Sequence, residues 1–65
     1  MKLLLNGASI DAQVNTLAEL LIAEGLAEAK VATAVNGQFV PATARSEQKL
    51  MTGDAIEVLS PMQGG

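Results

Sequence analysis

Two Asn-Gly dipeptides constrain the fold more than any other feature of this sequence. Asn6-Gly7 lies within residues 1–12 and Asn36-Gly37 within residues 31–40, in each case between two short runs suited to strands. Asparagine and glycine both tolerate a positive φ, so the dipeptide is typical of a two-residue turn between antiparallel strands. The sequence therefore predicts two β-hairpins, separated by about twenty residues that need another structure.

Side chains alternate between the two faces of a strand, which sorts the apolar residues of the first hairpin. Leu3 and Leu5 share one face of the entering strand, and Ile10 lies on the same side of the returning strand. Leu4 points the other way. We expect Leu3, Leu5 and Ile10 in the core and Leu4 at the surface.

A capping box predicts a helix between the hairpins. The Thr16 hydroxyl is expected to accept from the amide of Glu19, while the Glu19 carboxylate accepts from the amide of Thr16. The apolar stripe follows at i, i+3 and i+4: Leu17, Leu20 and Leu21. Gly25 is expected to end the helix in a left-handed conformation. Ile22 and Leu26 are expected to extend the stripe around its side.

The second half of the chain contains a further strand after the second hairpin. Pro41 ends the pairing of that hairpin, because proline has no amide hydrogen. Residues 42–49 are polar and are expected to be irregular. Leu50 is predicted to fill the core, and residues 52–54 form a turn that starts the last strand at residues 55–60.

Alternation in the last strand separates its core face from its exposed face. Ile56 and Val58 point one way, whereas Glu57 and Leu59 point the other. Because Glu57 belongs in water, Leu59 beside it is expected to be at least partly exposed.

The predicted order is strand, strand, helix, strand, strand, strand, within one domain of residues 1–60. A mixed sheet accommodates it if the last strand pairs in parallel with the first and the helix covers the apolar face. This is the α+β arrangement of the β-grasp, or ubiquitin-like, fold, with one main helix across the sheet. A ferredoxin-like fold would need a second helix at residues 42–49, which Pro41 and the polar run keep short.

Composition excludes most catalytic chemistry for this chain. Its 65 residues include no His, Cys, Trp or Tyr, so the usual general base, thiol nucleophile, zinc ligands and stacking rings are all missing. The formal net charge of -3 does not suit binding to phosphate backbones, so no nucleic acid is expected. We predict a protein that is not an enzyme and binds no cofactor or metal itself.

The sequence also carries no predicted membrane or export segment. The apolar run at residues 1–5 ends at Asn6-Gly7, well short of the apolar core of a signal peptide. The run at residues 20–23 ends at Glu24, so no membrane span is expected. Cysteine-free chains suit a reducing compartment, and we expect a cytoplasmic protein.

Residues 61–65, Pro-Met-Gln-Gly-Gly, are predicted to be a flexible tail beyond the domain. Pro61 ends the strand pairing, and two glycines without Cβ atoms allow the tail to enter a narrow channel. The carboxylate of Gly65 is a poor electrophile at neutral pH and requires activation. Adenylation by ATP, followed by attack of a sulfur nucleophile, would leave an acyl-sulfur species on Gly65. The partners must supply the ATP site and the nucleophile.

Several of these motifs together resemble the sulfur carrier proteins of thiamin biosynthesis, the ubiquitin-like ThiS family. The resemblance runs nearly end to end and rests on five segments: Val35-Asn36-Gly37, Val40-Pro41, residues 50–54, residues 56–58 and the ending at residues 61–65. It implies a β-grasp fold in which Gly65 is adenylated, converted to a thiocarboxylate and used as a sulfur donor. The family often has a basic residue directly after Val-Pro, whereas this chain has Ala42 and a later Arg45.

The resemblance also implies the partners of the chain. These are an adenylating enzyme of the ubiquitin-activating type (ThiF type), which uses ATP, and thiazole synthase (ThiG type), with a sulfur donor such as a cysteine desulfurase. Gly65 is the implied reacting residue, and Gly64 belongs to the tail that enters both partners. Gln63 and Met62 precede them and are expected to contact the partners as well.

Exposed apolar residues of the sheet are candidates for partner binding. Leu4, Phe39 and Leu59 form a candidate patch, although single exposed apolar residues are common on any protein surface. Three alternative functions stay open from the sequence. They are the small subunit of molybdopterin synthase, a ubiquitin-like modifier that forms isopeptide bonds, and an interaction domain with an inert tail.

Overall fold

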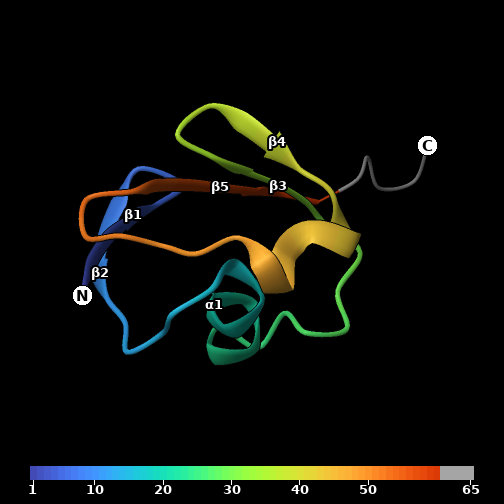
Figure 1. Ribbon diagram of the computed structural model, residues 1–65, viewed down its shortest axis with the longest axis horizontal. Coiled ribbons are helices and arrows are strands. Elements are labelled where there is room, and N and C mark those ends of the chain that lie inside the picture. The colour runs from blue at the N-terminus through green and yellow to red at the C-terminus, as the bar shows by residue number, and fades with distance from the viewer. Residues whose placement is uncertain (61–65) are drawn as a thin grey trace.

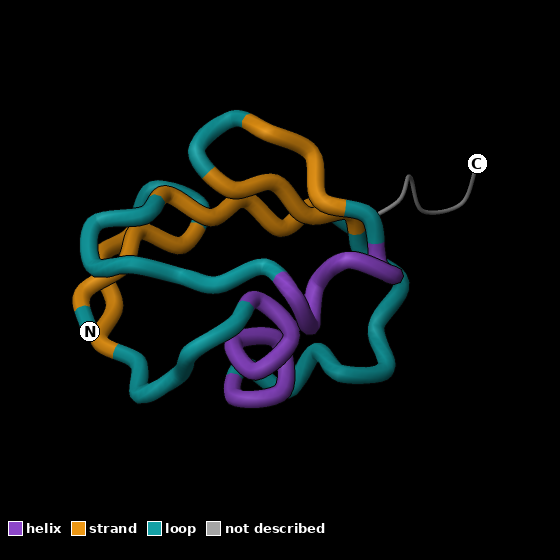
Figure 2. The backbone as a smooth tube through the Cα atoms, in the orientation of Figure 1, coloured by secondary structure: helices purple, strands orange, loops and turns teal. Residues whose placement is uncertain are grey.

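The computed structural model describes residues 1–60, which form a five-stranded mixed sheet with a helical layer on one face (Figure 1). The elements in chain order are β1 (Lys2–Leu5), β2 (Ala8–Asp11), α1 (Leu17–Ala23), β3 (Ala32–Val35), β4 (Gln38–Val40), the 3₁₀ helix η1 (Ala42–Glu47) and β5 (Ala55–Leu59). The strand order is β2-β1-β5-β3-β4, and both helical segments lie on the same side of the sheet (Figure 2). The predicted β-grasp fold is confirmed.

The last strand, β5, joins the two hairpins into one sheet. It runs parallel to β1, with Leu5 beside Ile56, and antiparallel to β3, with Val35 also beside Ile56. Hydrogen bonding on both sides makes β5 the central strand. The hairpins therefore depend on the C-terminal strand for their contact with each other.

Both Asn-Gly dipeptides occupy the predicted hairpin turns. Asn6 and Gly7 have φ of 50° and 85°, and Asn36 and Gly37 have φ of 51° and 83°. Two consecutive positive φ values are the mark of a type I′ turn, whose twist matches that of the flanking strands. The local signal in the sequence was sufficient to place both turns.

Helix α1 begins at a cap that differs from the predicted capping box in one bond. The Glu19 amide donates to the Thr16 hydroxyl over 3.2 Å, as expected. The Glu19 carboxylate, however, accepts from the amide of Asn15 at 2.8 Å and not from that of Thr16. Thr16 is extended (φ -129°, ψ 164°), and successive amides of an extended chain point to opposite sides. The amide that faces Glu19 is therefore the one a residue earlier.

Gly25 ends α1 in the left-handed conformation that the sequence predicted, with φ of 77°. The Leu26 amide donates to the Leu21 carbonyl (2.7 Å) and the Gly25 amide to the Ile22 carbonyl (3.0 Å), the two bonds of a Schellman motif. The prediction that Ile22 extends the apolar stripe is wrong, because its side chain is 63% exposed. At about 100° per residue, Ile22 turns away from the face that Leu21 shares with the core.

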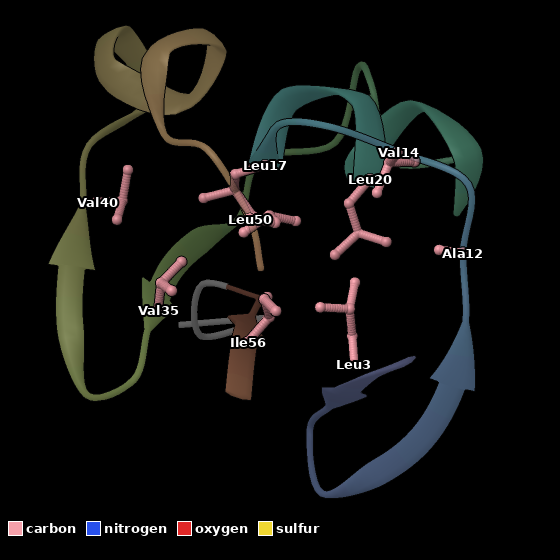
Figure 3. Packing of buried hydrophobic residues seen from close by; sticks show 9 residues of the cluster. All are labelled: Leu3, Ala12, Val14, Leu17, Leu20, Val35, Val40, Leu50 and Ile56. Atoms are coloured by element: carbon pink, nitrogen blue, oxygen red, sulfur yellow. The ribbon is translucent and has the colours of Figure 1, made fainter. Parts of the chain in front are cut away.

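The core lies between α1 and the sheet. Figure 3 shows Leu20 pointing from the helix toward Leu3, and Leu17 lying beside Leu50 above Ile56. The buried cluster comprises Leu3, Ala12, Val14, Leu17, Leu20, Val35, Val40, Leu50 and Ile56. Leu5, Ile10 and Val58 pack against it and are only partly buried. The prediction that Leu50 fills the core is confirmed.

A 3₁₀ helix, η1, occupies the segment expected to be irregular. Pro41 stands at its N-terminal end with φ of -67°, and the Ala44 amide donates to the Pro41 carbonyl over 2.9 Å. Arg45 fixes the helix to β3 and to the residue before it: its Nε donates to the Thr33 hydroxyl (3.0 Å) and its Nη2 to the Val31 carbonyl (2.6 Å). The polar composition of the segment did not indicate that Arg45 has partners in the sheet.

Ion pairs connect the first two residues to Asp11 at the end of β2. The α-amino group of Met1 donates to the Asp11 carboxylate over 3.2 Å, and Lys2 Nζ lies 3.6 Å from its other oxygen. The hydrogen bond and the charge of the Met1 ammonium lower the pKa of Asp11 below its ordinary value of 3.8, with a smaller contribution from Lys2.

Replacing Asp11 with asparagine is expected to lower the free energy of unfolding slightly at neutral pH. A carboxylate whose pKa is lower in the folded state stabilises the fold above its unfolded pKa, and this stabilisation is lost as the pH falls through the folded value. The difference between wild type and Asp11→Asn should therefore shrink below pH 3.8. Urea melts over a pH series measure this difference in the free energy of unfolding. A difference that persists unchanged in acid would contradict this role for Asp11.

Candidate functional site

The tail residues predicted to react or bind partners lie outside the described part of the chain. Met62, Gln63, Gly64 and Gly65, with the rest of residues 61–65, follow the last described residue, Ser60. The structure instead describes the strand that leads to them and the surface beside it.

The strand that leads to the tail is held on both sides up to its last residue. Leu59, the final residue of β5, lies opposite Ala32 of β3. On the other side the backbone of Val58 is bonded to the Asn6 side chain, at 2.8 Å through the Val58 amide and 3.1 Å through its carbonyl. The tail thus starts from a fixed point of the sheet.

A shallow apolar hollow lies next to this point, on the sheet face opposite α1. Its volume is about 90 Å³, and its lining includes Ala32, Ala34, Phe39, Glu57 and Leu59. Leu59 lies opposite Ala32 and Phe39 opposite Ala34, so the two alanines leave space between the larger side chains. Phe39 is 69% exposed and Leu59 is 64% exposed. We call Ala32, Ala34, Phe39 and Leu59 the sheet-face patch.

Leu4 is exposed as predicted but does not belong to the sheet-face patch. It lies beside Ala55 at the start of β5, whereas Leu59 is four residues further along the same strand. At about 3.3 Å per residue this separates them by about 13 Å along the strand. The structure therefore brings together Phe39 and Leu59, and it places Leu4 apart from them.

The acidic residues near β5 have different roles. The Asp54 carboxylate accepts from the Met51 amide and from the Asn36 side chain, both at 2.9 Å, so it holds the turn before β5. Glu57 lines the hollow beside the sheet-face patch and is exposed. Of these two carboxylates, only Glu57 lies beside the sheet-face patch.

A second hollow, of about 340 Å³, lies between α1 and η1 and was not foreseen from the sequence. Its lining includes Leu21 and the exposed Ile22 on the helix side, and Ala42 and Arg45 on the η1 side. Ala42 and Arg45 are three residues apart and so lie one above the other on a 3₁₀ helix.

Hydrogen bonds from the two turn asparagines to β5 also escaped the sequence reasoning. Asn6 bonds to Val58, and Asn36 bonds to Ala55 through an amide-to-Oδ1 contact of 2.9 Å. The sequence offered one indication of these bonds: both turns have asparagine at a position where glycine or aspartate also fits, which suggests a use for the amide side chain.

Within residues 1–60, no helix is both long enough and apolar enough to cross a membrane.

Comparisons with known proteins identify relatives over nearly the whole chain. The model of the ThiS family matches residues 4–65. A crystal structure of the thiamine biosynthesis protein ThiS from Geobacter metallireducens is similar, with 32% identity, a TM-score of 0.85 and full coverage of both chains. An NMR solution structure of a thiamine biosynthesis protein from the same organism has 33% identity and a TM-score of 0.79, and the match covers all of this chain and 88% of that one. No curated protein sequence matches.

Proposed function

We propose that this chain, which belongs to the ThiS family, carries sulfur as a thiocarboxylate on Gly65 for the synthesis of the thiazole of thiamin. The observation that carries the proposal is the family match, which extends through the terminal Gly64 and Gly65. The similar structures from thiamine biosynthesis support the same pathway. The chain acts as a co-substrate of its partners and not as an enzyme.

Partner enzymes supply the chemistry that the chain lacks. A carboxylate oxygen of Gly65 attacks the α-phosphate of ATP, which releases pyrophosphate and leaves an acyl adenylate. A sulfur nucleophile then attacks the acyl carbon and AMP leaves. Sulfide gives the thiocarboxylate of Gly65 directly, whereas a persulfide gives an acyl disulfide that a thiol of a partner cleaves to the thiocarboxylate. No His or Cys occurs in the chain to act as base or nucleophile. The adenylating enzyme and the sulfur donor therefore provide both, and thiazole synthase receives the sulfur.

The described residues contribute a rigid base and a docking surface. The central strand β5 leads directly to the tail, and the sheet-face patch lies at the C-terminal end of this strand. A partner that covers Phe39 and Leu59 would bury two exposed apolar side chains close to the start of the tail. Docking there brings the carboxylate of Gly65 within reach of a nearby active site.

Adenylation assays test the proposed function directly. The purified chain is incubated with an adenylating enzyme of the thiamin pathway, ATP and labelled pyrophosphate, and exchange of label into ATP is measured. We expect exchange that depends on the chain. Exchange no greater than with the enzyme alone would contradict the proposal. Exchange only with the corresponding enzyme of molybdenum cofactor synthesis would assign the chain to that pathway.

Replacing Leu59 with glutamate is expected to weaken docking without unfolding the chain. An introduced charge at the centre of an apolar contact raises the KM of the adenylating enzyme for the chain about tenfold, with kcat nearly unchanged. The matched control is Ile22→Glu, since Ile22 is 63% exposed against 64% for Leu59 but lies on the helix side. Equal KM values for the two variants would exclude the sheet-face patch as the docking surface.

A further inference from the structure

The two Asn-Gly turns share more than their backbone conformation, because both asparagines bond to β5. The Asn6 amide donates to the Ile56 carbonyl (2.8 Å), and its side chain exchanges two bonds with Val58. The Asn36 amide donates to the Ala55 carbonyl (2.7 Å), and its Oδ1 accepts from the Ala55 amide (2.9 Å). Each turn thus extends the hydrogen bonding of the central strand at one of its ends.

The side chain of Asn6 makes the hydrogen bonds to β5 that a further residue of β1 would make. Pairing of β1 with β5 ends at Leu5 and Ile56, because β1 then turns into its hairpin. A side-chain amide has one acceptor and two donor hydrogens, so it can mimic a peptide group. Asn6 Oδ1 accepts from the Val58 amide over 2.8 Å, and Asn6 Nδ2 donates to the Val58 carbonyl over 3.1 Å. The side chain therefore continues the parallel ladder by one step.

The two asparagines hold opposite ends of β5. Ala55, bonded to Asn36, is the first residue of the strand, and Val58, bonded to Asn6, is the last but one. Only the Asn6 end leads directly to Ser60 and the tail. Beyond Ile56, the pairs with β3 hold one side of the strand, and Asn6 provides the bonds on the other side.

We propose that Asn6 is a positioning residue for the tail. By holding Val58 it fixes the strand end that leads to Ser60, the point from which the Gly65 carboxylate must reach a partner's active site. This inference rests on the proposed function. A turn position with φ of 50° would accept glycine equally well, but only an amide side chain supplies both the donor and the acceptor that Val58 uses.

Matched glycine substitutions separate this role from that of turn formation. Asn6→Gly and Asn36→Gly both keep a Gly-Gly turn and each lose the side-chain bonds to one end of β5. In the adenylation assay with the chain varied up to saturation, we expect Asn6→Gly to lower kcat about tenfold with a smaller change in KM. Asn36→Gly should stay within about twofold of wild type. Asn6→Asp, which keeps the acceptor and loses the donor, should fall between wild type and Asn6→Gly.

Amide hydrogen exchange provides a readout that is independent of activity. Exchange at the Val58 amide should accelerate about tenfold or more in Asn6→Gly and stay unchanged in Asn36→Gly, with the reverse at the Ala55 amide. Equal kcat values for the two glycine variants would overturn the inference, as would a Val58 amide that stays protected in Asn6→Gly. If the wild-type chain is not adenylated, the proposed function fails, and with it any role of Asn6 in positioning the tail.

Discussion

Leu20→Ala is expected to remove about half of the free energy of unfolding of this domain. Leu20 is fully buried and points from α1 toward Leu3 (Figure 3). Truncating a buried leucine costs about 2–5 kcal/mol, because transfer free energy is lost and a cavity is left. At about 0.05–0.15 kcal/mol per residue, a chain of 65 residues has a free energy of unfolding of about 3–10 kcal/mol. Urea melts followed by circular dichroism measure the loss.

Leu59→Ala is the matched control for Leu20→Ala. It removes the same atoms from a side chain that is 64% exposed, so its free energy of unfolding should stay within about 0.5 kcal/mol of wild type. If the two variants unfolded at the same urea concentration, the helix would not pack on the sheet as the structure has it.

Deleting Gly65 is expected to abolish carrier activity while the domain stays folded. The deletion shortens the chain by about 3.5 Å, and a misplacement of about 1 Å already costs about a hundredfold in a positioned reaction. Adenylation should fall by more than about a hundredfold, and cells that depend on this chain should require added thiazole. The melting temperature should equal that of wild type, because the core is built within residues 1–60.

Gly65→Ala separates the effect of tail length from the effect of a missing side chain at the last residue. This variant keeps the reach of the chain and adds one Cβ atom next to the carboxylate, so its adenylation should fall between those of wild type and the deletion. Normal adenylation of the deletion variant would contradict the assignment of Gly65 as the reacting residue.

The sequence was informative wherever the signal is local. Asn-Gly dictates a type I′ turn, Thr16 caps the helix directly before the apolar stripe begins at Leu17, and Gly25 ends that helix. Alternation along β5 was enough to predict that Ile56 is buried and Leu59 exposed. Each of these features depends on the conformation of a few neighbouring residues, so the sequence contains the necessary information.

Features that depend on distant partners were not predictable in this way. Asn6 bonds to Val58 across 52 positions, and Arg45 bonds to Val31 across 14. Nothing near Arg45 indicates that its guanidinium has acceptors in the sheet, and so η1 was expected to be irregular. The prediction for Ile22 was wrong for a different reason: within α1 its side chain lies about 100° around the helix from that of Leu21, so it turns away from the core and is 63% exposed.

In the candidate site, too, the local features were predictable from the sequence and the long-range ones were not. Exposure of Leu4, Phe39 and Leu59 followed from alternation, but their grouping depends on the register between strands. That register places Phe39 and Leu59 around one hollow and Leu4 beside Ala55. The reactivity of Gly65 is a proposal that rests on the family match through residue 65, and functional experiments are its test.

Intact-protein mass spectrometry of the chain, purified from cells that contain its biosynthetic partners, tests the central claim most directly. We expect a species heavier by the difference between one sulfur and one oxygen atom, which disappears when Gly65 is deleted. This would establish the thiocarboxylate. Absence of that species, with conjugates to lysines of other proteins in its place, would contradict the carrier function and indicate a ubiquitin-like modifier. Absence of both would leave an interaction domain with an inert tail.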